Sequence, residues 1–255
     1  MDLAARHHAS HRAGLAAITA AAPRGEVVEL AGGVLAAVDP DRPDRSLFNS
    51  VVYEDPEALV AAVPELARRY EAAGVRAWTV WVQPRDVAAL GPPLARAGHV
   101  LDASPEQMAA RIEEMALDQV PRVAVRPADP AACGALNDLA YGIEPGTLGE
   151  PLGRLDGPPF TWFGVEEDGR LVACAATVEH EGDCWITFVA THPDHRGRGL
   201  AGAVIAAGLR EAAGRGCETT TLEATQLGRP AYRRIGFHEL GAIEMWERRA
   251  PVPSS

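Results

Sequence analysis

The 255-residue sequence contains no lysine, so all 24 of its basic side chains are arginine. This absence excludes two kinds of chemistry that need an amine on a flexible stem, Schiff-base catalysis and the phosphate-binding loop GxxxxGK[ST]. The basic residues are outnumbered by 35 acidic ones, which gives a formal net charge of −11. Neither half of the chain shows a basic patch, so we expect no nucleic-acid partner.

Long apolar runs are also missing, and none reaches the roughly 18 residues that suggest a membrane span. The alanine-rich N-terminal segment, which we expect to be helical, is broken by Arg6, Arg12 and several histidines, so it lacks the apolar core of a secretory signal. No carboxylate or thiol lies beside those histidines in the sequence, which favours a solvated helix face over a metal site. They are His7, His8 and His11. These features predict a cytoplasmic protein with no membrane partner and no metal.

The cysteines lie too far apart for a Cys-x-x-Cys pair, which argues against a zinc knuckle or a redox dithiol and favours buried free thiols. They are Cys133, Cys174, Cys184 and Cys217. A hairpin with its tip at Glu181 and Gly182 would place Cys174 opposite Val189. The same register would place Cys184 opposite Glu179, so the sequence predicts that these two thiols do not pair.

The second half of the chain shows a clear series of elements. Residues 162–191 contain three apolar runs separated by the turn sequences EEDGR and EHEGD, which favour antiparallel hairpins. Helical spacing begins at Leu200 and stops at Gly214 and Gly216. The other expected elements are a strand at 122–128, a helix at 129–143, a Gly/Pro-rich loop at 144–160, a strand at 217–225, a short helix at 228–236 and a final strand or pair at 237–249.

The first half shows a fainter version of the same order, which suggests an internal repeat. Its expected elements are a helix at 55–74 interrupted at Pro64, a strand at 75–82, a helix ending at 94–98 and an extended run at 99–101. A helix at 104–117 and a linker near 116–122 would then separate the halves. We therefore expect a degenerate domain at 1–120, a second domain at 121–250 and a loose tail at 251–255.

A glycine-rich turn follows the third apolar run. Gly197, Gly199 and Gly202 match the G-x-G-x-x-G dinucleotide fingerprint, and Glu223 follows at about the distance of its ribose-binding acid. However, the strand ends near Thr191 and the residues HPDHR separate it from the glycines, so the fingerprint's tight strand-to-helix turn cannot form. Hairpins rather than crossover helices also precede the turn, which makes NAD binding a remote alternative.

The same stretch resembles the pyrophosphate-binding signature of the GNAT superfamily of N-acetyltransferases, [R/Q]-x-x-G-x-[G/A]. Arg196, Gly199 and Ala201 occupy its fixed places, and Pro193 lies three residues ahead of them. Backbone N–H groups at the start of a helix can converge on an anion, and glycine permits close approach. The resemblance implies acetyl-CoA as co-substrate, bound by Val189, Ala190, Thr191, Arg196, Gly197, Arg198, Gly199, Leu200, Ala201 and Gly202.

The resemblance covers roughly residues 122–248 and extends to the sequence AYRRIGF, with a tyrosine four residues before a Gly-Phe. It implies an α+β fold, a mixed and mostly antiparallel central sheet flanked by helices, preceded by a smaller degenerate α/β domain. It also implies that Tyr232 protonates the leaving thiolate and that a backbone N–H near Val189 stabilises the oxyanion. Glu223 and Glu179 are candidate general bases, although each is more often a solvated or structural residue.

The first half lacks these features. Leu94 stands where Tyr232 would be, and the glycine turn is replaced by YEDPEA, whose acidic residues would repel phosphate. The resemblance places the acceptor pocket near residues 141–162 and implies a small-molecule or peptide amine as acceptor, while a homodimer is left open. A non-catalytic acyl-CoA-binding or sensing module is the alternative from a different functional class.

Overall fold

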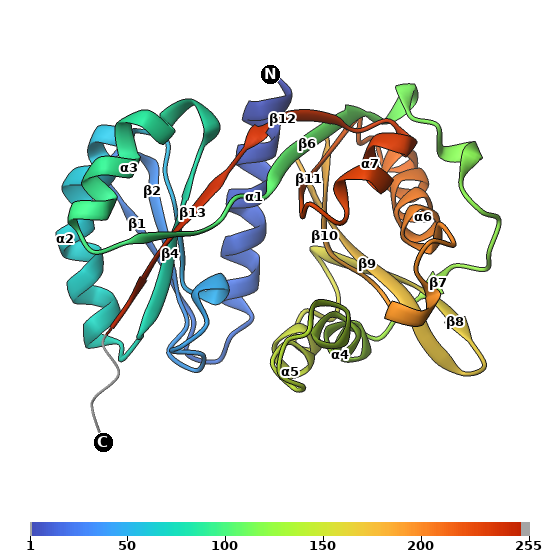
Figure 1. Cartoon of the computed structure of the whole chain (residues 1–255), viewed down its shortest axis with the longest axis horizontal. Helices are drawn as coiled ribbons and strands as arrows, with labels where there is room; N and C mark the ends of the chain where they lie inside the picture. Colours follow the sequence, from blue (N-terminus) through green and yellow to red (C-terminus); the bar gives the residue numbers. More distant parts are fainter. Residues whose placement is uncertain (1, 251–255) are drawn as a thin grey trace. The chain divides into compact units, whose positions relative to one another are not determined.

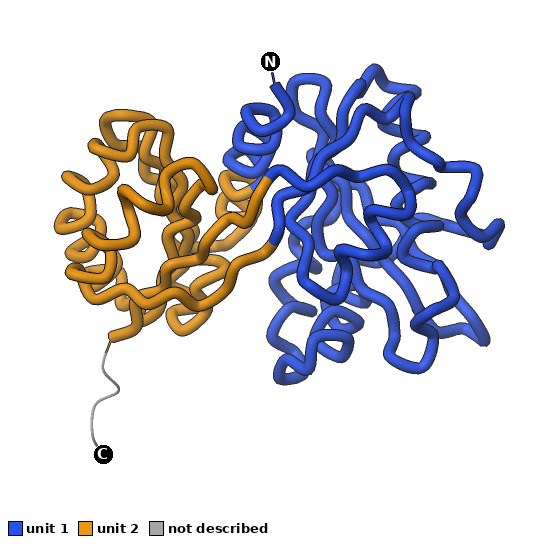
Figure 2. The backbone as a smooth tube through the Cα atoms, turned by 45° about the horizontal axis from the view of Figure 1, so that its top comes forward, with its two compact units in different colours: residues 1–14, 106–240 blue, residues 15–105, 241–255 orange. Residues whose placement is uncertain are grey.

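The computed structural model describes residues 2–250, which fold into two compact units (Figure 2). Unit 1 comprises residues up to 14 together with 106–240, and unit 2 comprises residues 15–105 together with the chain from 241. The tail expected at 251–255 lies outside the described residues. Among the residues described, no helix is both long and apolar enough to cross a membrane.

Unit 1 is built on a seven-stranded mixed sheet, in the order β12-β6-β11-β10-β9-β8-β7. The strands β8, β9 and β10 form the two predicted hairpins, and β10 then pairs in parallel with β11 (Figure 1). Its elements are the first turns of α1 (Leu3–Ala20), β6 (Glu106–Arg111), β7 (Arg126–Pro127), α4 (Pro130–Tyr141), α5 (Gly149–Gly153), β8 (Phe160–Glu167), β9 (Arg170–His180), β10 (Asp183–Thr191), α6 (Leu200–Gly214), β11 (Thr219–Ala224), α7 (Arg229–Ile235) and β12 (His238–Ala242).

Helices cover both faces of this sheet. Successive side chains of a strand point to opposite faces. Ala173 and Ala175 of β9 lie in the core with Leu209 of α6, whereas Cys174 between them is within 3.6 Å of the Asn137 amide of α4. The two helices α4 and α6 therefore lie on opposite faces of the sheet.

Unit 2 contains a six-stranded mixed sheet, in the order β1-β2-β3-β4-β13-β5. Its longest helix, α2, starts at the cap Asp55, whose side chain accepts from the Glu57 N–H, and runs through Pro64 without the predicted interruption. The elements are β1 (Glu26–Leu30), β2 (Val34–Val38), β3 (Ser50–Val52), α2 (Pro56–Ala72), β4 (Ala77–Val82), α3 (Val87–Arg96), β5 (Val100–Ala103) and β13 (Glu244–Arg249).

The two units repeat one pattern, as the sequence suggested. In unit 2 two antiparallel pairings join β1, β2 and β3, α2 follows, and β4 pairs in parallel with β3. In unit 1 the same pairings join β8, β9 and β10, α6 follows, and β11 pairs in parallel with β10. A short helix and an edge strand complete each copy, as α3 and β5 or as α7 and β12.

Each sheet also receives a strand from the far side of the chain. β6 follows the strands of unit 2 in sequence, yet it pairs antiparallel with β11 in unit 1. β13 follows α7 and β12 of unit 1, yet it lies between β4 and β5 in unit 2. The chain therefore changes unit near residues 14, 105 and 240 rather than between 120 and 121, and the predicted boundary differs from the structural one.

The helix predicted over residues 104–117 was wrong. Its alanines and glutamates favour a helix locally, but residues 106–111 form β6, with Met108 and Ala110 in the core of unit 1. Pairing along the whole of β11 outweighs this local preference, because helix propensity is a weak bias that tertiary contacts override. The expected linker near 116–122 also belongs to unit 1 and carries a single turn of 3-10 helix at Leu117–Gln119.

A β-bulge in β10 changes the predicted hairpin register. Cys184 pairs with Glu179 as expected, but Ala190 rather than Val189 lies opposite Cys174. The prediction for Cys174 was wrong because the bulge inserts one residue, which counting from the turn cannot reveal. All four cysteines are free and buried, as predicted.

Candidate functional site

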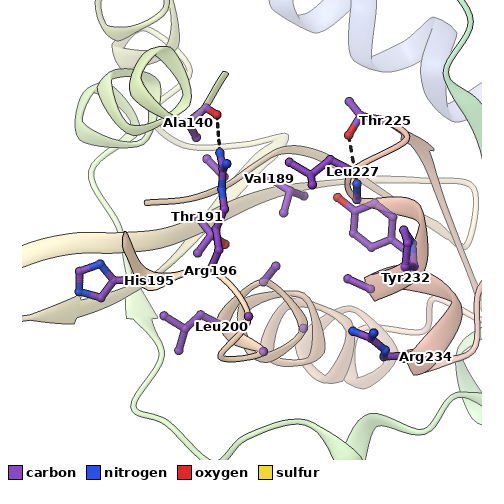
Figure 3. A pocket seen from close by; sticks show the side chains of 18 of the residues that line it. Ala140, Val189, Thr191, His195, Arg196, Leu200, Thr225, Leu227, Tyr232 and Arg234 are labelled. Atoms are coloured by element: carbon purple, nitrogen blue, oxygen red, sulfur yellow. Dashed lines mark hydrogen bonds between the residues drawn. The ribbon is translucent and has the colours of Figure 1, made fainter. Parts of the chain in front are cut away.

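A pocket of about 370 Å³ opens in unit 1 between the end of β10, the glycine turn and α7 (Figure 3). Nearly all the predicted cofactor-binding residues line it. From the predicted set these are Val189, Ala190, Thr191, Arg196, Gly197, Gly199, Leu200, Ala201 and Gly202. Further lining residues include Ala140, Tyr141, His195, Thr225, Leu227, Gly228, Tyr232 and Arg234.

The glycine turn has the backbone that only glycine adopts readily. Gly197 and Gly199 have φ angles of +75° and +76°, and α6 begins directly afterwards at Leu200. A Cβ on Gly199 would lie 2.7 Å from Cγ of Pro121, so the turn also depends on close packing. The unpaired N–H groups at the start of α6 therefore face the pocket with the positive end of the helix dipole.

The two arginines of the turn have different environments. Arg196 lines the pocket and donates from Nη2 to the Ala140 carbonyl oxygen at 2.5 Å, which ties the turn to the end of α4. Arg198 does not line the pocket, because its guanidinium donates twice to the Glu167 carboxylate, at 2.9 and 2.6 Å. The prediction that Arg198 binds the cofactor is therefore not supported by its position.

Arg234 supplies a positive charge that the sequence did not single out. It lies on α7, and its guanidinium points toward α6 in Figure 3. Its neighbour Arg233 lies 3.7 Å from the Glu239 carboxylate, whereas no ion pair is found for Arg234 among residues 2–250. Arg234 is thus available to an anionic ligand in the pocket.

Tyr232 forms the wall of the pocket opposite β10. Its ring is buried, with 7% of the residue exposed, and its hydroxyl points toward Leu227 (Figure 3). A Cβ on Gly228 would lie 2.9 Å from the Tyr232 ring, so a glycine there makes room for the phenol. Burial, with a smaller contribution from Tyr141, raises the pKa of Tyr232. The phenol therefore keeps its proton at neutral pH.

The strand β10 is distorted where it meets the pocket. Its parallel pairing with β11 ends at Ile186, and the bulge follows between Thr187 and Ala190. Phe188 within the bulge has a φ of +50°. The hydroxyl of Tyr141 donates to the Val189 carbonyl at 2.8 Å. The end of β10 at 189–191, which the resemblance assigned to the cofactor, is therefore splayed away from β11 and lines the pocket.

Glu223 does not line the pocket. Its Oε1 lies 2.8 Å from Nε2 of His7 and 3.6 Å from Nδ1 of His11, and its Oε2 accepts from the Trp185 indole at 3.0 Å. Burial acts to raise the pKa of Glu223, but the two histidines and the indole lower it overall, to about 2. A carboxylate with this pKa is a weak proton acceptor, so the position of Glu223 favours a structural role.

Two of the N-terminal histidines, His7 and His11, are not on a solvated face. His7 and His11 are 0% and 1% exposed and pack against β11 and β10. That prediction was wrong because it considered only sequence neighbours, whereas the carboxylate partner lies more than 200 residues away in the chain. Within residues 2–250, no group of three or more His, Cys, Asp or Glu side chains is arranged to hold a metal ion.

Glu179, the remaining candidate base, lies outside the pocket, and the described part of unit 2 has no comparable site. Glu179 is in an ion pair with Arg215 on the surface and does not line the pocket. In unit 2 the helix α2 occupies the place of α6, but it starts at the cap Asp55 instead of a glycine turn. Leu94, which stands at the place of Tyr232, is buried in the core. Unit 2 therefore repeats the fold without the anion-binding turn or the phenol.

Comparison with known proteins agrees with this fold. The structure is similar to that of a GCN5-related N-acetyltransferase from Kribbella flavida, with 19% sequence identity and a TM-score of 0.71. The match covers 98% of this chain and 97% of that protein. A GCN5-related N-acetyltransferase from Sphaerobacter thermophilus matches 88% over 84% of its own chain, at 20% identity and a TM-score of 0.56. No curated protein matches the sequence significantly.

A tandem GNAT protein from the clavulanic acid biosynthesis pathway matches 92% of this chain over 86% of its own, at 14% identity and a TM-score of 0.59. These structural matches show a shared fold, including the repeated GNAT-like arrangement of unit 2. Residues 121–241 also match the model of the acetyltransferase (GNAT) family, and they include the glycine turn, α6 and Tyr232. Residues 121–241 of this chain therefore belong to the acetyltransferase (GNAT) family.

Proposed function

We propose that the protein is an N-acetyltransferase that uses acetyl-CoA and a primary amine. The observation that carries the proposal is that one pocket contains both an anion-binding helix start and a buried, protonated phenol. Membership of an acetyltransferase family supports acyl transfer in general. The pocket favours catalysis over binding alone, because a buried phenol beside the anion-binding turn is suited to protonating a leaving thiolate.

The residues of the pocket suit the diphosphate of coenzyme A. Its negative charge would meet the N–H groups at the start of α6, with Arg196 and Arg234 on either side. The glycine turn leaves no side chain between the backbone and the anion, and Pro121 closes the turn from behind. When bound, acetyl-CoA would supply a thioester as the acyl donor.

Each catalytic task can be related to a group of this chain. In the reaction an N–C bond forms and a C–S bond breaks, while the amine loses a proton and the sulfur gains one. The Val189 N–H, at the splayed part of β10, is our candidate for stabilising the oxyanion. The phenol of Tyr232 is protonated at neutral pH and is our candidate for donating a proton to the leaving thiolate.

The proton of the amine goes to a group other than Glu223. Glu223 has a pKa near 2 and is engaged by His7 and Trp185, so it is poorly suited to act as the base. We propose that water or a backbone carbonyl accepts the proton. The acceptor itself is assigned only by class, as a small-molecule or peptide amine.

The test combines binding and turnover of the full-length protein. Calorimetry with acetyl-CoA should show binding at one site per chain, with no comparable binding of NAD. A panel of polyamines, amino sugars and peptide amines should then include at least one that releases free CoA. Binding of acetyl-CoA without release on any amine would contradict the enzyme and favour an acyl-CoA sensor instead.

A further inference from the structure

The bulge in β10 is held in a conformation that its own residue disfavours. Phe188 has a φ of +50°, which bulky side chains rarely adopt, and the register of β10 against β9 shifts by one residue around it. A backbone of this kind persists only where surrounding contacts fix it. The contacts around the Phe188 carbonyl therefore identify what holds the bulge open.

Asn137 of α4 is the main anchor. Its side chain is buried, with 2% of the residue exposed, and its Nδ2 donates to the Phe188 carbonyl at 3.1 Å. The same Nδ2 donates to the Cys133 carbonyl at 2.9 Å, one helical turn earlier. The thiol of Cys174 is 3.7 Å from the Phe188 oxygen. One buried amide thus joins the backbone of α4 to the bulge.

This anchor determines where the next N–H points. In a trans peptide the C=O and the N–H point in opposite directions. The Phe188 carbonyl faces α4 and Cys174 of β9, so the Val189 N–H faces the other side of β10. On that side β10 pairs with β11 only as far as Ile186, and the pocket begins.

The same helix also holds the following carbonyl. Tyr141 lies four residues after Asn137, so the two side chains leave the same face of α4. Its hydroxyl donates to the Val189 carbonyl at 2.8 Å. Two side chains of α4 therefore fix the peptide group that contains the Val189 N–H and the peptide group that follows it.

We propose that Asn137 is a positioning residue, which orients the Val189 N–H toward the oxyanion by anchoring the Phe188 carbonyl. The inference rests on the proposed acetyltransferase function, because it assigns a role within that reaction. Asn137 itself does not line the pocket.

The test compares Asn137→Ala in two backgrounds. In the natural background the variant should lower kcat about 10-fold to 100-fold, somewhat less than loss of a whole oxyanion donor. The Kd for acetyl-CoA and the KM for the amine should change less than about threefold, because the binding groups stay in place. Asn137→Asp keeps the side-chain shape without the Nδ2 donor and replaces the alanine variant if that variant does not fold.

The second background is Phe188→Gly. Glycine adopts a positive φ without strain, so the bulge should then need no anchor. Adding Asn137→Ala to Phe188→Gly should lower kcat less than about threefold relative to Phe188→Gly alone. An equal loss of kcat in the two backgrounds would overturn the proposal, since Asn137 would then act by some route other than the bulge.

A crystal structure of the Asn137→Ala variant provides a readout that needs no activity. We expect residue 188 to leave the positive-φ region and β10 to lose its register shift. An unchanged bulge would overturn the proposal even if the protein is an acetyltransferase. Conversely, a collapsed bulge in a protein that transfers no acetyl group would contradict the proposed function and leave the anchoring role intact.

Discussion

At the scale of single residues, the sequence predicted what is local and missed what folding brings together. The turn from Arg196 to Ala201 is contiguous, so its glycines and its helix start were visible as a pattern. Tyr141 and Arg234 reach the same pocket from other helices, and no local pattern marks them. Arg198 was predicted to bind the cofactor because it lies within the turn, but its guanidinium is hydrogen-bonded to Glu167 of β8 and does not line the pocket.

Arg234 should contribute to cofactor binding through its charge. We expect Arg234→Gln to weaken acetyl-CoA binding about threefold to tenfold, on the order of 1 kcal/mol, because one unpaired cation of the pocket is removed. Arg233→Gln is the matched control, since Arg233 is beside Glu239 and does not line the pocket. Calorimetry at two salt concentrations measures both. Equal weakening in the two variants would assign the effect to overall charge.

Gly199 should be required for both stability and binding. Gly199→Ala forces a Cβ into a backbone with φ of +76° and to within 2.7 Å of Pro121, so we expect a loss of about 1–3 kcal/mol of stability and weaker acetyl-CoA binding. The control is Gly214→Ala, near the end of the same helix, where nothing lies within 4 Å. Denaturant unfolding should show that variant to be as stable as the parent or slightly more so. A stable Gly199→Ala protein would contradict the role given to this turn.

At the scale of elements, periodicity predicted most helices and hairpins of unit 1 but could not predict partners. The helix α1 was expected from its alanines, yet its buried face depends on Glu223 of β11. The strand β6 was predicted as a helix because neither its own sequence nor that of β11 reveals that the two segments pair. Long-range partners decided both cases.

The histidines of α1 should make stability depend on pH. Burial lowers the pKa of His11 to about 4, despite the attraction of Glu223 and with added repulsion from His7 and His8. Between pH 6.5 and about 4 the unfolded chain therefore binds a proton that the folded chain does not, so stability falls as the pH falls through this window. The full effect is on the order of 3 kcal/mol for a shift of this size.

Replacing the histidine should flatten that dependence. We expect His11→Gln to reduce the slope of unfolding free energy against pH between 6.5 and 4, measured by urea unfolding at several pH values. Buried His99 in unit 2 has its pKa lowered to about 4 in the same way, so His99→Gln should remove a separate contribution. A slope that is unchanged in His11→Gln would show that α1 is not anchored as described.

At the scale of the whole molecule, the exchange of strands makes the family-matched segment incomplete by itself. Residues 121–241 contain the pocket but lack β6, which covers the edge of β11, and lack the two histidines that contact Glu223. A sheet edge and a buried carboxylate would then both lose their partners. The repeat could be recognised from the sequence because each half keeps its order of elements. The exchange of β6 and β13 between the units could not, because it changes only which strands pair.

This exchange predicts how fragments behave. A fragment of residues 121–250 should not unfold cooperatively on heating, because it lacks β6 and leaves the buried Glu223 carboxylate without its two histidine contacts. A buried charge left without partners costs about 3–5 kcal/mol. A fragment of residues 106–250 regains β6 and should recover part of the sheet signal in circular dichroism. If the shorter fragment melted at the temperature of the full chain, the contribution of α1 and β6 to unit 1 would be refuted.

We propose that the pocket transfers an acetyl group with Tyr232 as the proton donor, and the most direct measurement separates turnover from binding in Tyr232→Phe. With an amine substrate in hand, we predict that kcat for CoA release falls about 100-fold to 10,000-fold. The Kd for acetyl-CoA should stay within about twofold, because the ring and the α6 turn remain in place. Tyr141→Phe, which removes the other phenol of the pocket, should lower kcat far less. A Tyr232→Phe enzyme with unchanged kcat would contradict the account.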